Sequence, residues 1–211
     1  MHEAIQHYLK VMYEESAAAA DRIDIIEYFR ERFREVYKSS VKDNKGEHFS
    51  NPQEMSEFFE DGIAILQWFK SKRGQYFTKR NTSLIGIEIP ILYKLDNGIK
   101  NVYFRGHVDF ILYDEANDKY IIYDIKTSTK GWSDYDKKDQ TKLNQILLYK
   151  KFFSQLTGVS EEKIDVMFFI VKTSVLLEFI DSTRTTRGFE YVCLLFFIPI
   201  FNKLAIQNTK M

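Results

Sequence analysis

The sequence is poor in cysteine, with Cys193 the single one among 211 residues. One cysteine excludes a disulfide within the chain, a four-cysteine zinc site and a cysteine-ligated iron–sulfur cluster. Free cysteines are usually buried, so we expect Cys193 to be a core residue rather than a nucleophile.

Net charge is absent as well, because 30 Lys and Arg residues balance 30 Asp and Glu residues. The chain therefore lacks the global basic field that marks many nucleic-acid-binding domains. Binding to a polyanion would have to come from a local patch.

The chain also lacks a long apolar run. Its most apolar segment, YVCLLFFIPI at 191–200, is too short to span a bilayer comfortably. We expect a buried strand interrupted by Pro199, with a membrane or partner contact as the alternative. The N-terminus, MHEAIQHYLK, has no basic-then-apolar signal pattern, so a cytoplasmic location is expected and no membrane.

What is present is a globular composition, with 45% apolar and 16% aromatic residues. The length suits one domain, which we divide into a helical region (1–80), a core of sheet and helix (81–172) and a C-terminal extension (173–211). Helical periodicity covers 2–15, about 25–36 and 54–72; β-rich segments cover 84–95, 101–114 and 119–127; a helix and a strand follow at 134–157 and 165–171. This order predicts an α/β fold of the α+β type, in which helices flank one sheet. The first two helical segments are interpreted as two helices or one long bent helix.

Asp124 and Lys126 stand inside an apolar strand segment, YIIYDIKT. An Asp/Glu–x–Lys triplet occurs four times in the chain, which is close to chance, but only this one lies in an expected strand. Residues i and i+2 of a strand share one face. Because a buried ion pair is costly, either this pair lies on an exposed face or it has a function.

The preceding strand predicts a partner for this pair. If the hairpin turns at about 116–117, Asp109 lies opposite Asp124 and His107 lies opposite Lys126. Facing carboxylates repel each other, so the arrangement favours a cation between them, and carboxylate and water ligands suit Mg²⁺ or Mn²⁺ better than zinc. A slip of one residue would place Asp109 and Asp124 on opposite faces.

Two helices add candidate residues. Gln145 and Tyr149 share one helix face because they are four residues apart, although a surface glutamine is the simpler reading. His2 precedes Ile5 and Leu9 on one apolar stripe and should face the core or a cleft, with a structural or frayed histidine as the alternative.

The motifs H-E-A-I-Q, G-H-V-D, Y-D-I-K-T and Q-I-L-L-Y, in this order and spacing, resemble the PD-(D/E)XK nuclease superfamily. The likeness covers about residues 1–172 and is strongest to RecB-like exonuclease domains, including phage and CRISPR-adaptation relatives. It implies a restriction-endonuclease-like αβββαβ core, with a central mixed sheet flanked by helices. It also implies a metal-dependent deoxyribonuclease with one or two Mg²⁺ or Mn²⁺ ions and no iron–sulfur cluster.

The resemblance assigns roles to single residues. The metal ligands would be His2, Asp109, Asp124 and the backbone carbonyl of Ile125. Lys126 would position or polarise the attacking water, Gln145 would orient Lys126 or the DNA backbone, and Tyr149 would pack behind Gln145.

Four further residues receive supporting roles from the same resemblance. Glu88 matches a strand glutamate that orients other groups, and Gly106 matches a glycine that lets strand and substrate approach closely. Lys130 and Trp132 would contact phosphate and base respectively, with ordinary packing as the alternative for Trp132.

The resemblance implies an exonuclease of DNA recombination or repair, or of phage DNA processing, in a bacterial or phage-infected cell. The sequence differs from the pattern in the short segment before His2 and in the apolar tail after Arg187. These differences favour the alternative of a weak or inactive relative that binds DNA or a partner protein. A phosphodiesterase acting on RNA or small nucleotides is a third reading, and a protein partner or homo-oligomer is left open.

Overall fold

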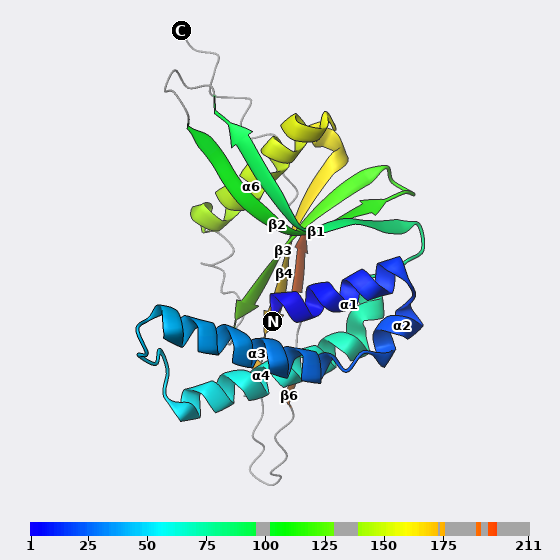
Figure 1. The fold of residues 1–211 in the computed structure, drawn as a ribbon. Helices are drawn as coiled ribbons and strands as arrows, with labels where there is room; N and C mark the ends of the chain where they lie inside the picture. Colours follow the sequence, from blue (N-terminus) through cyan, green and yellow to red (C-terminus); the bar gives the residue numbers. More distant parts are fainter. Residues whose placement is uncertain (96–101, 129–138, 173, 176–188, 191–193, 198–211) are drawn as a thin grey trace, which may run out of the picture.

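The computed structural model describes residues 1–95, 102–128, 139–172, 174–175, 189–190 and 194–197 (Figure 1). The helices are α1 (His2–Glu14), α2 (Ala17–Arg22), α3 (Ile25–Asp43), α4 (Pro52–Lys72) and α6 (Gln140–Thr157), with short 3-10 helices η1 (Arg73–Gln75) and η2 (Glu161–Lys163). The strands are β1 (Thr82–Lys94), β2 (Tyr103–Asp114), β3 (Lys119–Ser128), β4 (Ile164–Lys172), β5 (Ser174–Val175), β6 (Phe189–Glu190) and β7 (Leu194–Phe197). The predicted α+β fold is confirmed.

Polar caps divide the N-terminal region into more helices than expected. Ser16 accepts a hydrogen bond from the backbone N–H of Ala19, and Asp24 accepts one from that of Glu27. Each cap satisfies an otherwise unpaired N–H at a new helix start. The alanine run therefore forms a separate helix, α2, and neither predicted alternative, two helices or one bent helix, is right.

The main sheet has the order β1-β2-β3-β4-β7. Strands β1, β2 and β3 form an antiparallel meander, β4 pairs parallel to β3, and β7 pairs antiparallel to β4. The sheet is therefore mixed, with the αβββαβ order that the resemblance implies. Strand β7 lies within the apolar tail, whose Cys193 and Pro199 fall outside the described residues. None of the described helices combines the length and the apolar character needed to cross a membrane.

The register of the β2–β3 hairpin is as predicted. The ladder runs from Asp114–Lys119 at the turn to Phe110–Tyr123, which corresponds to a turn at about 116–117. Tyr123 and Phe110 stack face to face, with ring centroids 4.6 Å apart. This aromatic pair closes the ladder at the end away from the turn.

Beyond Phe110–Tyr123 the two strands separate, so two predicted pairs do not form. Asp109 is not paired opposite Asp124, and His107 is not paired opposite Lys126 in the described ladder. The carboxylate of Asp109 instead accepts a hydrogen bond from the backbone N–H of Ile125, at 2.5 Å. A side chain thus takes the place of the next backbone pair, and the strands fork at this point.

Two hydrophobic cores lie on the two faces of the sheet. Helices α1–α4 cover one face and α6 covers the other (Figure 1). The β1–β2 ribbon changes faces at the fork: Ile87 and Phe110 pack with the α1 side, whereas Ile89 and Val108 pack with the α6 side. Between them Glu88 has a φ of 50°, a left-handed backbone conformation that is uncommon for a residue with a side chain. This turn of the ribbon places the fork between α1 and α6.

Candidate active site

Two polar side chains are buried among the described residues, and both lie at the fork. Gln6 is 3% exposed and Asp124 is 5% exposed. Buried polar groups normally have hydrogen-bonding partners, and each exception needs an explanation. The fork is therefore the place in the described fold where function is expected to oppose stability.

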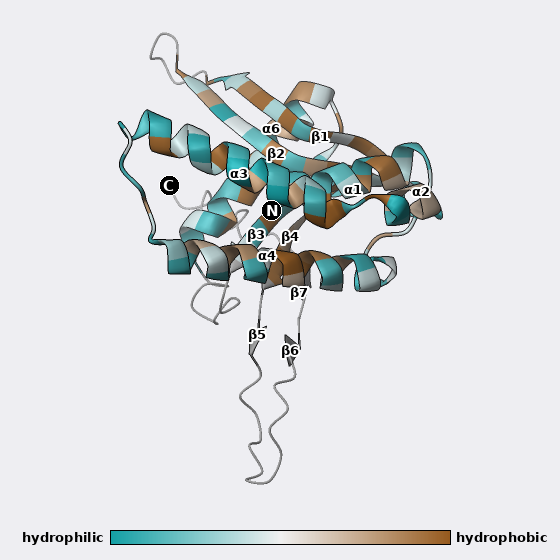
Figure 2. Cartoon of the chain, turned by 60° about the horizontal axis from the view of Figure 1, so that its bottom comes forward, coloured by the Kyte–Doolittle hydropathy of each residue, from teal (hydrophilic) through white to brown (hydrophobic). Residues whose placement is uncertain are grey.

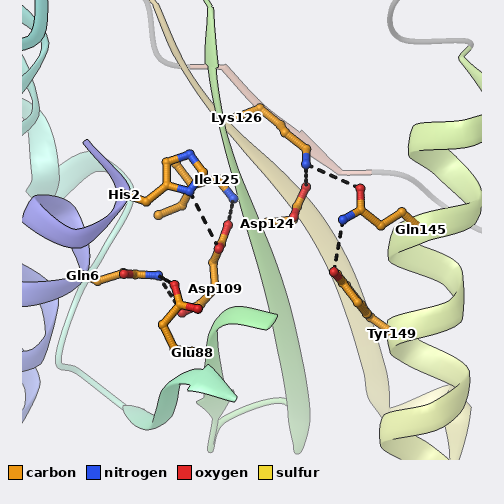
Figure 3. Close-up of polar contacts among 9 residues, drawn as sticks. All are labelled: His2, Gln6, Glu88, Asp109, Asp124, Ile125, Lys126, Gln145 and Tyr149. Carbon is orange, nitrogen blue, oxygen red and sulfur yellow. Dashed lines mark hydrogen bonds and ion pairs between the residues drawn. The ribbon is translucent and has the colours of Figure 1, made fainter. Parts of the chain in front are cut away.

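Asp109, on β2, points toward Ile125 of β3 and His2 of α1 (Figure 3). One carboxylate oxygen accepts the N–H of Ile125, and the other lies 3.8 Å from Nδ1 of His2. The His2 side chain is 39% exposed and that of Asp109 is 15% exposed. Helix α1 thus brings its first residue to a carboxylate more than a hundred residues away in the sequence.

Asp124 points to the α6 side of the sheet, where its carboxylate is desolvated. Oδ2 lies 2.8 Å from Nζ of Lys126, yet no described donor makes a hydrogen bond of good geometry to this buried oxygen. Burial raises the pKa of the Asp124 carboxyl; Lys126 opposes this rise, and the negative charge of Asp109 adds to it. The site therefore holds a buried carboxylate that is paired with an ammonium group and still has a raised pKa.

A chain of contacts joins Lys126 to α6 (Figure 3). Lys126 Nζ donates to Oε1 of Gln145 at 3.5 Å, and Nε2 of Gln145 donates to the hydroxyl of Tyr149 at 3.0 Å. The structure brings Gln145 and Tyr149 to the same face of α6, as their spacing predicts. The ammonium group of Lys126 is thereby held between a carboxylate and an amide.

Gly106 supports this chain from β2. A Cβ atom at this position would lie 2.6 Å from Cε1 of Tyr149. The ring of Tyr149 therefore packs directly on the strand backbone, which only glycine permits here. The resemblance implies that Gly106 admits the substrate; the contact found in the structure is with Tyr149.

Gln6 is a site residue that the sequence interpretation missed. Its Nε2 donates to Oε1 of Glu88 at 2.6 Å and to the backbone carbonyl of Asp109 at 3.1 Å. It therefore links α1 to both strands at the point where Glu88 adopts its unusual backbone conformation. The signal was its position four residues after His2, which places both side chains on one helix face.

The residues at the fork suit a hard divalent cation in their chemistry. Two carboxylates, a histidine and the Ile125 carbonyl are oxygen and nitrogen donors of the kind that Mg²⁺ and Mn²⁺ accept, and the buried Oδ2 of Asp124 lacks a hydrogen bond. In the described part of the chain, no three His, Cys, Asp or Glu side chains converge closely enough to hold a metal. Two further candidates, Lys130 and Trp132, lie outside the described residues.

Most of the chain matches the model of a known protein family. A model of the PD-(D/E)XK nuclease superfamily matches residues 1–189, a range that contains the α1 side and the α6 side of the fork. No curated protein matches the chain.

Proposed function

The chain belongs to the PD-(D/E)XK nuclease superfamily, and on this premise we propose that it is a Mg²⁺- or Mn²⁺-dependent deoxyribonuclease whose active site is the β2–β3 fork. The observation that carries the proposal is the meeting of Asp109, Asp124 and Lys126 between α1 and α6. Hydrolysis of nucleic acid follows from the superfamily; DNA as substrate and the choice of metal are our proposals.

The proposed ligands are His2, Asp109, Asp124 and the backbone carbonyl of Ile125. A bound Mg²⁺ or Mn²⁺ would supply a water of lowered pKa and positive charge at the phosphate. The hydrogen bond from the Ile125 N–H fixes one oxygen of Asp109, so the other oxygen is the one that faces His2, the neighbouring proposed ligand. Asp124, paired with Lys126 at 2.8 Å, would offer its carboxylate from the opposite side.

Lys126 provides the positive charge that belongs to the protein itself. In hydrolysis a water oxygen bonds to phosphorus, the bond from phosphorus to the leaving sugar oxygen breaks, and that oxygen takes up a proton. An ammonium group beside the phosphate stabilises the negative charge that grows on the nonbridging oxygens. Gln145, oriented by Tyr149, holds this ammonium in place.

We further propose a RecB-like exonuclease, acting in the cytoplasm in recombination, repair or phage DNA processing. The order of the four motifs supports this narrower assignment. We also propose that the chain forms one nuclease domain, because the core under α1 contains both residues of the helical region, such as Leu66 and Phe69, and sheet residues, such as Phe110 and Phe169.

The decisive experiment compares linear with circular DNA in the presence of Mg²⁺, Mn²⁺ or EDTA, using the wild type and Asp124→Ala. We expect metal-dependent cleavage by the wild type only, and faster loss of the linear substrate. No metal-dependent cleavage, with DNA binding retained, would favour the alternative of an inactive DNA-binding relative. Cleavage that survives Asp124→Ala would place the active site elsewhere.

A further inference from the structure

A cleft of about 550 Å³ opens beside the fork, between the N-terminus of α1 and the ends of α3 and α4 nearest their connecting loop. Figure 2 shows α3 and α4 spreading apart toward this loop. The volume lies within the range of about 300–1,000 Å³ that is usual for ligand-binding sites. The cleft reaches His2 at one end of the proposed metal site and Thr127, the residue after Lys126.

Aromatic side chains line the cleft and remain open to solvent. Phe49 is 60% exposed and Phe58 is 49% exposed. Deeper in the cleft, Phe33 and Phe29 pack against Phe59 in the hydrophobic core. Two exposed phenylalanines beside one cleft are costly to leave in water unless a ligand covers them.

The arginine side chain in the described lining of the cleft, Arg32, is already paired. The side chains of Glu3 and Arg32 form an ion pair, 2.5 Å apart. No uncompensated Lys or Arg among the described lining residues is available to bind a phosphate there. The cleft therefore suits a flat, uncharged group rather than the sugar–phosphate backbone.

We propose that this cleft binds the bases of unpaired nucleotides in the DNA strand whose phosphate lies at the fork. The inference rests on the proposed function and names its substrate class: a single strand, or a duplex end that opens. Bases stack on aromatic rings only when they are free of their pairing partners. Because the cleft joins the fork at His2 and Thr127, a strand with its phosphate at Asp109 and Asp124 brings its neighbouring bases to Phe49 and Phe58.

The test measures binding in EDTA, where metal-dependent cleavage is stopped. The probes are a fluorescein-labelled single-stranded oligo(dT), an abasic oligonucleotide of the same length, and a blunt duplex. We expect the wild type to prefer oligo(dT) over both, because the abasic strand has the same backbone without bases. Phe49→Ala and Phe58→Ala should each weaken oligo(dT) binding about tenfold, the size of one lost base–aromatic stack.

Two matched variants separate stacking from general damage. Phe58→Trp keeps an aromatic ring and should retain the preference for oligo(dT). Leu156→Ala removes an equally exposed apolar side chain, 50% exposed, at the far end of α6, and should leave binding unchanged. Because all three positions are exposed, the variants should keep the thermal stability of the wild type.

Equal binding of oligo(dT) and the abasic strand by the wild type would overturn the proposal. Unchanged oligo(dT) affinity in the Phe49→Ala and Phe58→Ala variants would overturn it too, and would leave a protein segment as the occupant to test. The readout is independent of catalysis, so a base preference in a protein that does not cleave DNA would support the cleft and contradict the nuclease. Cleavage by the wild type without a base preference would support the nuclease and contradict the base-binding cleft.

Discussion

The β2–β3 hairpin carries an aspartate near each end of its ladder, and the two lie in opposite environments. Asp114, at the turn, accepts hydrogen bonds from the N–H groups of Ala116 and Asn117 and from the Asn117 side chain. These bonds lower the pKa of its carboxyl. Asp124, at the fork, is buried with an oxygen that accepts no hydrogen bond from the described residues, and its pKa is raised.

The difference shows how one hairpin serves two purposes. At the turn, local donors stabilise the charge and the charge stabilises the turn. At the fork, desolvation works against the charge, so the folded protein keeps it at a cost in stability. Groups kept in this way are typical of functional sites.

The largest effect on cleavage is expected when the Asp124 carboxylate is replaced by an amide. The same replacement at Asp114 is the control. Asp124→Asn should lower metal-dependent cleavage by about 100-fold or more, since changes even around a metal ligand cost about 10–100-fold. Asp114→Asn should leave cleavage unchanged. Initial rates of cleavage of linear DNA check both expectations. Circular dichroism spectra check that both variants are folded like the wild type.

The same two variants test whether Mg²⁺ or Mn²⁺ binds at the fork or elsewhere on the protein. Mg²⁺ or Mn²⁺ should raise the melting temperature of the wild type and of Asp114→Asn, because a ligand that binds only the native state stabilises it. It should not raise that of Asp124→Asn. An equal shift in all three proteins would show that the ions bind away from the fork.

The contacts on the α1 side of the fork can be removed by replacing Gln6. Gln6→Ala removes a bond to the Glu88 carboxylate and one to the Asp109 carbonyl. Hydrogen bonds to charged groups contribute about 1.5–3 kcal/mol, so we expect the free energy of unfolding, measured in urea, to fall by that amount. We also expect slower cleavage, because Asp109 is less well held.

Gln53→Ala is the matched control for Gln6. Gln53 makes the same kind of bond, from its Nε2 to Glu57 four residues on, but on the exposed face of α4. An exposed pair of this spacing contributes about 0.2–0.5 kcal/mol. Equal losses for the two variants would show that the fork gives Gln6 no special role.

The contacts on the α6 side of the fork can be disturbed by replacing Gly106. In Gly106→Ala the new methyl group meets the ring of Tyr149, and overpacking of this kind costs about 1–3 kcal/mol. The displaced ring would also loosen Gln145 and lower the cleavage rate. Gly74→Ala, where nothing lies within 4 Å of the added Cβ, should leave stability and activity intact; a similar loss there would remove the steric explanation.

The smallest effect is the pH dependence of stability, which has opposite signs at the two ends. Asp124 has a raised folded pKa, so its ionised form costs stability at neutral pH, and Asp124→Asn should raise the melting temperature there. This gain should vanish below the unfolded value of about 3.9, where the carboxyl is protonated in both states.

Asp114 has a lowered folded pKa, so its ionised form contributes stability above the unfolded value. That contribution is lost as the pH falls through the folded pKa. Asp114→Asn should therefore lower the melting temperature at neutral pH and match the wild type in acid. Melting curves between about pH 3 and pH 7 check both signs, and a common sign would contradict the comparison.

Much of the fold could be predicted because it is written in local patterns. The sheet segments, the register set by the turn after Asp114, and the helix carrying Gln145 follow from period-2 and period-3.6 spacing and from turn residues. The separate helix α2 was missed because the capping role of Ser16 and Asp24 depends on one hydrogen bond each.

The candidate site was predicted only in part, for a physical reason. The register correctly brought Asp109 near Asp124, but the fork depends on competition: the Asp109 carboxylate replaces a backbone partner for the Ile125 N–H. Gln6 was missed because its partners lie on strands more than eighty residues away. The spacing of four residues from His2 places Gln6 on the same helix face, but it does not encode these distant partners.

The order of the strands, the hairpin register and the strand that carries Asp124 and Lys126 follow from sequence patterns alone. Three features depend on packing between distant segments: the ladder ends at Phe110–Tyr123, α1 and α6 reach the fork from opposite faces, and Asp124 is buried there. The reason is that side-chain periodicity selects which face of an element is buried, whereas the packing of two cores on one sheet selects what that face meets.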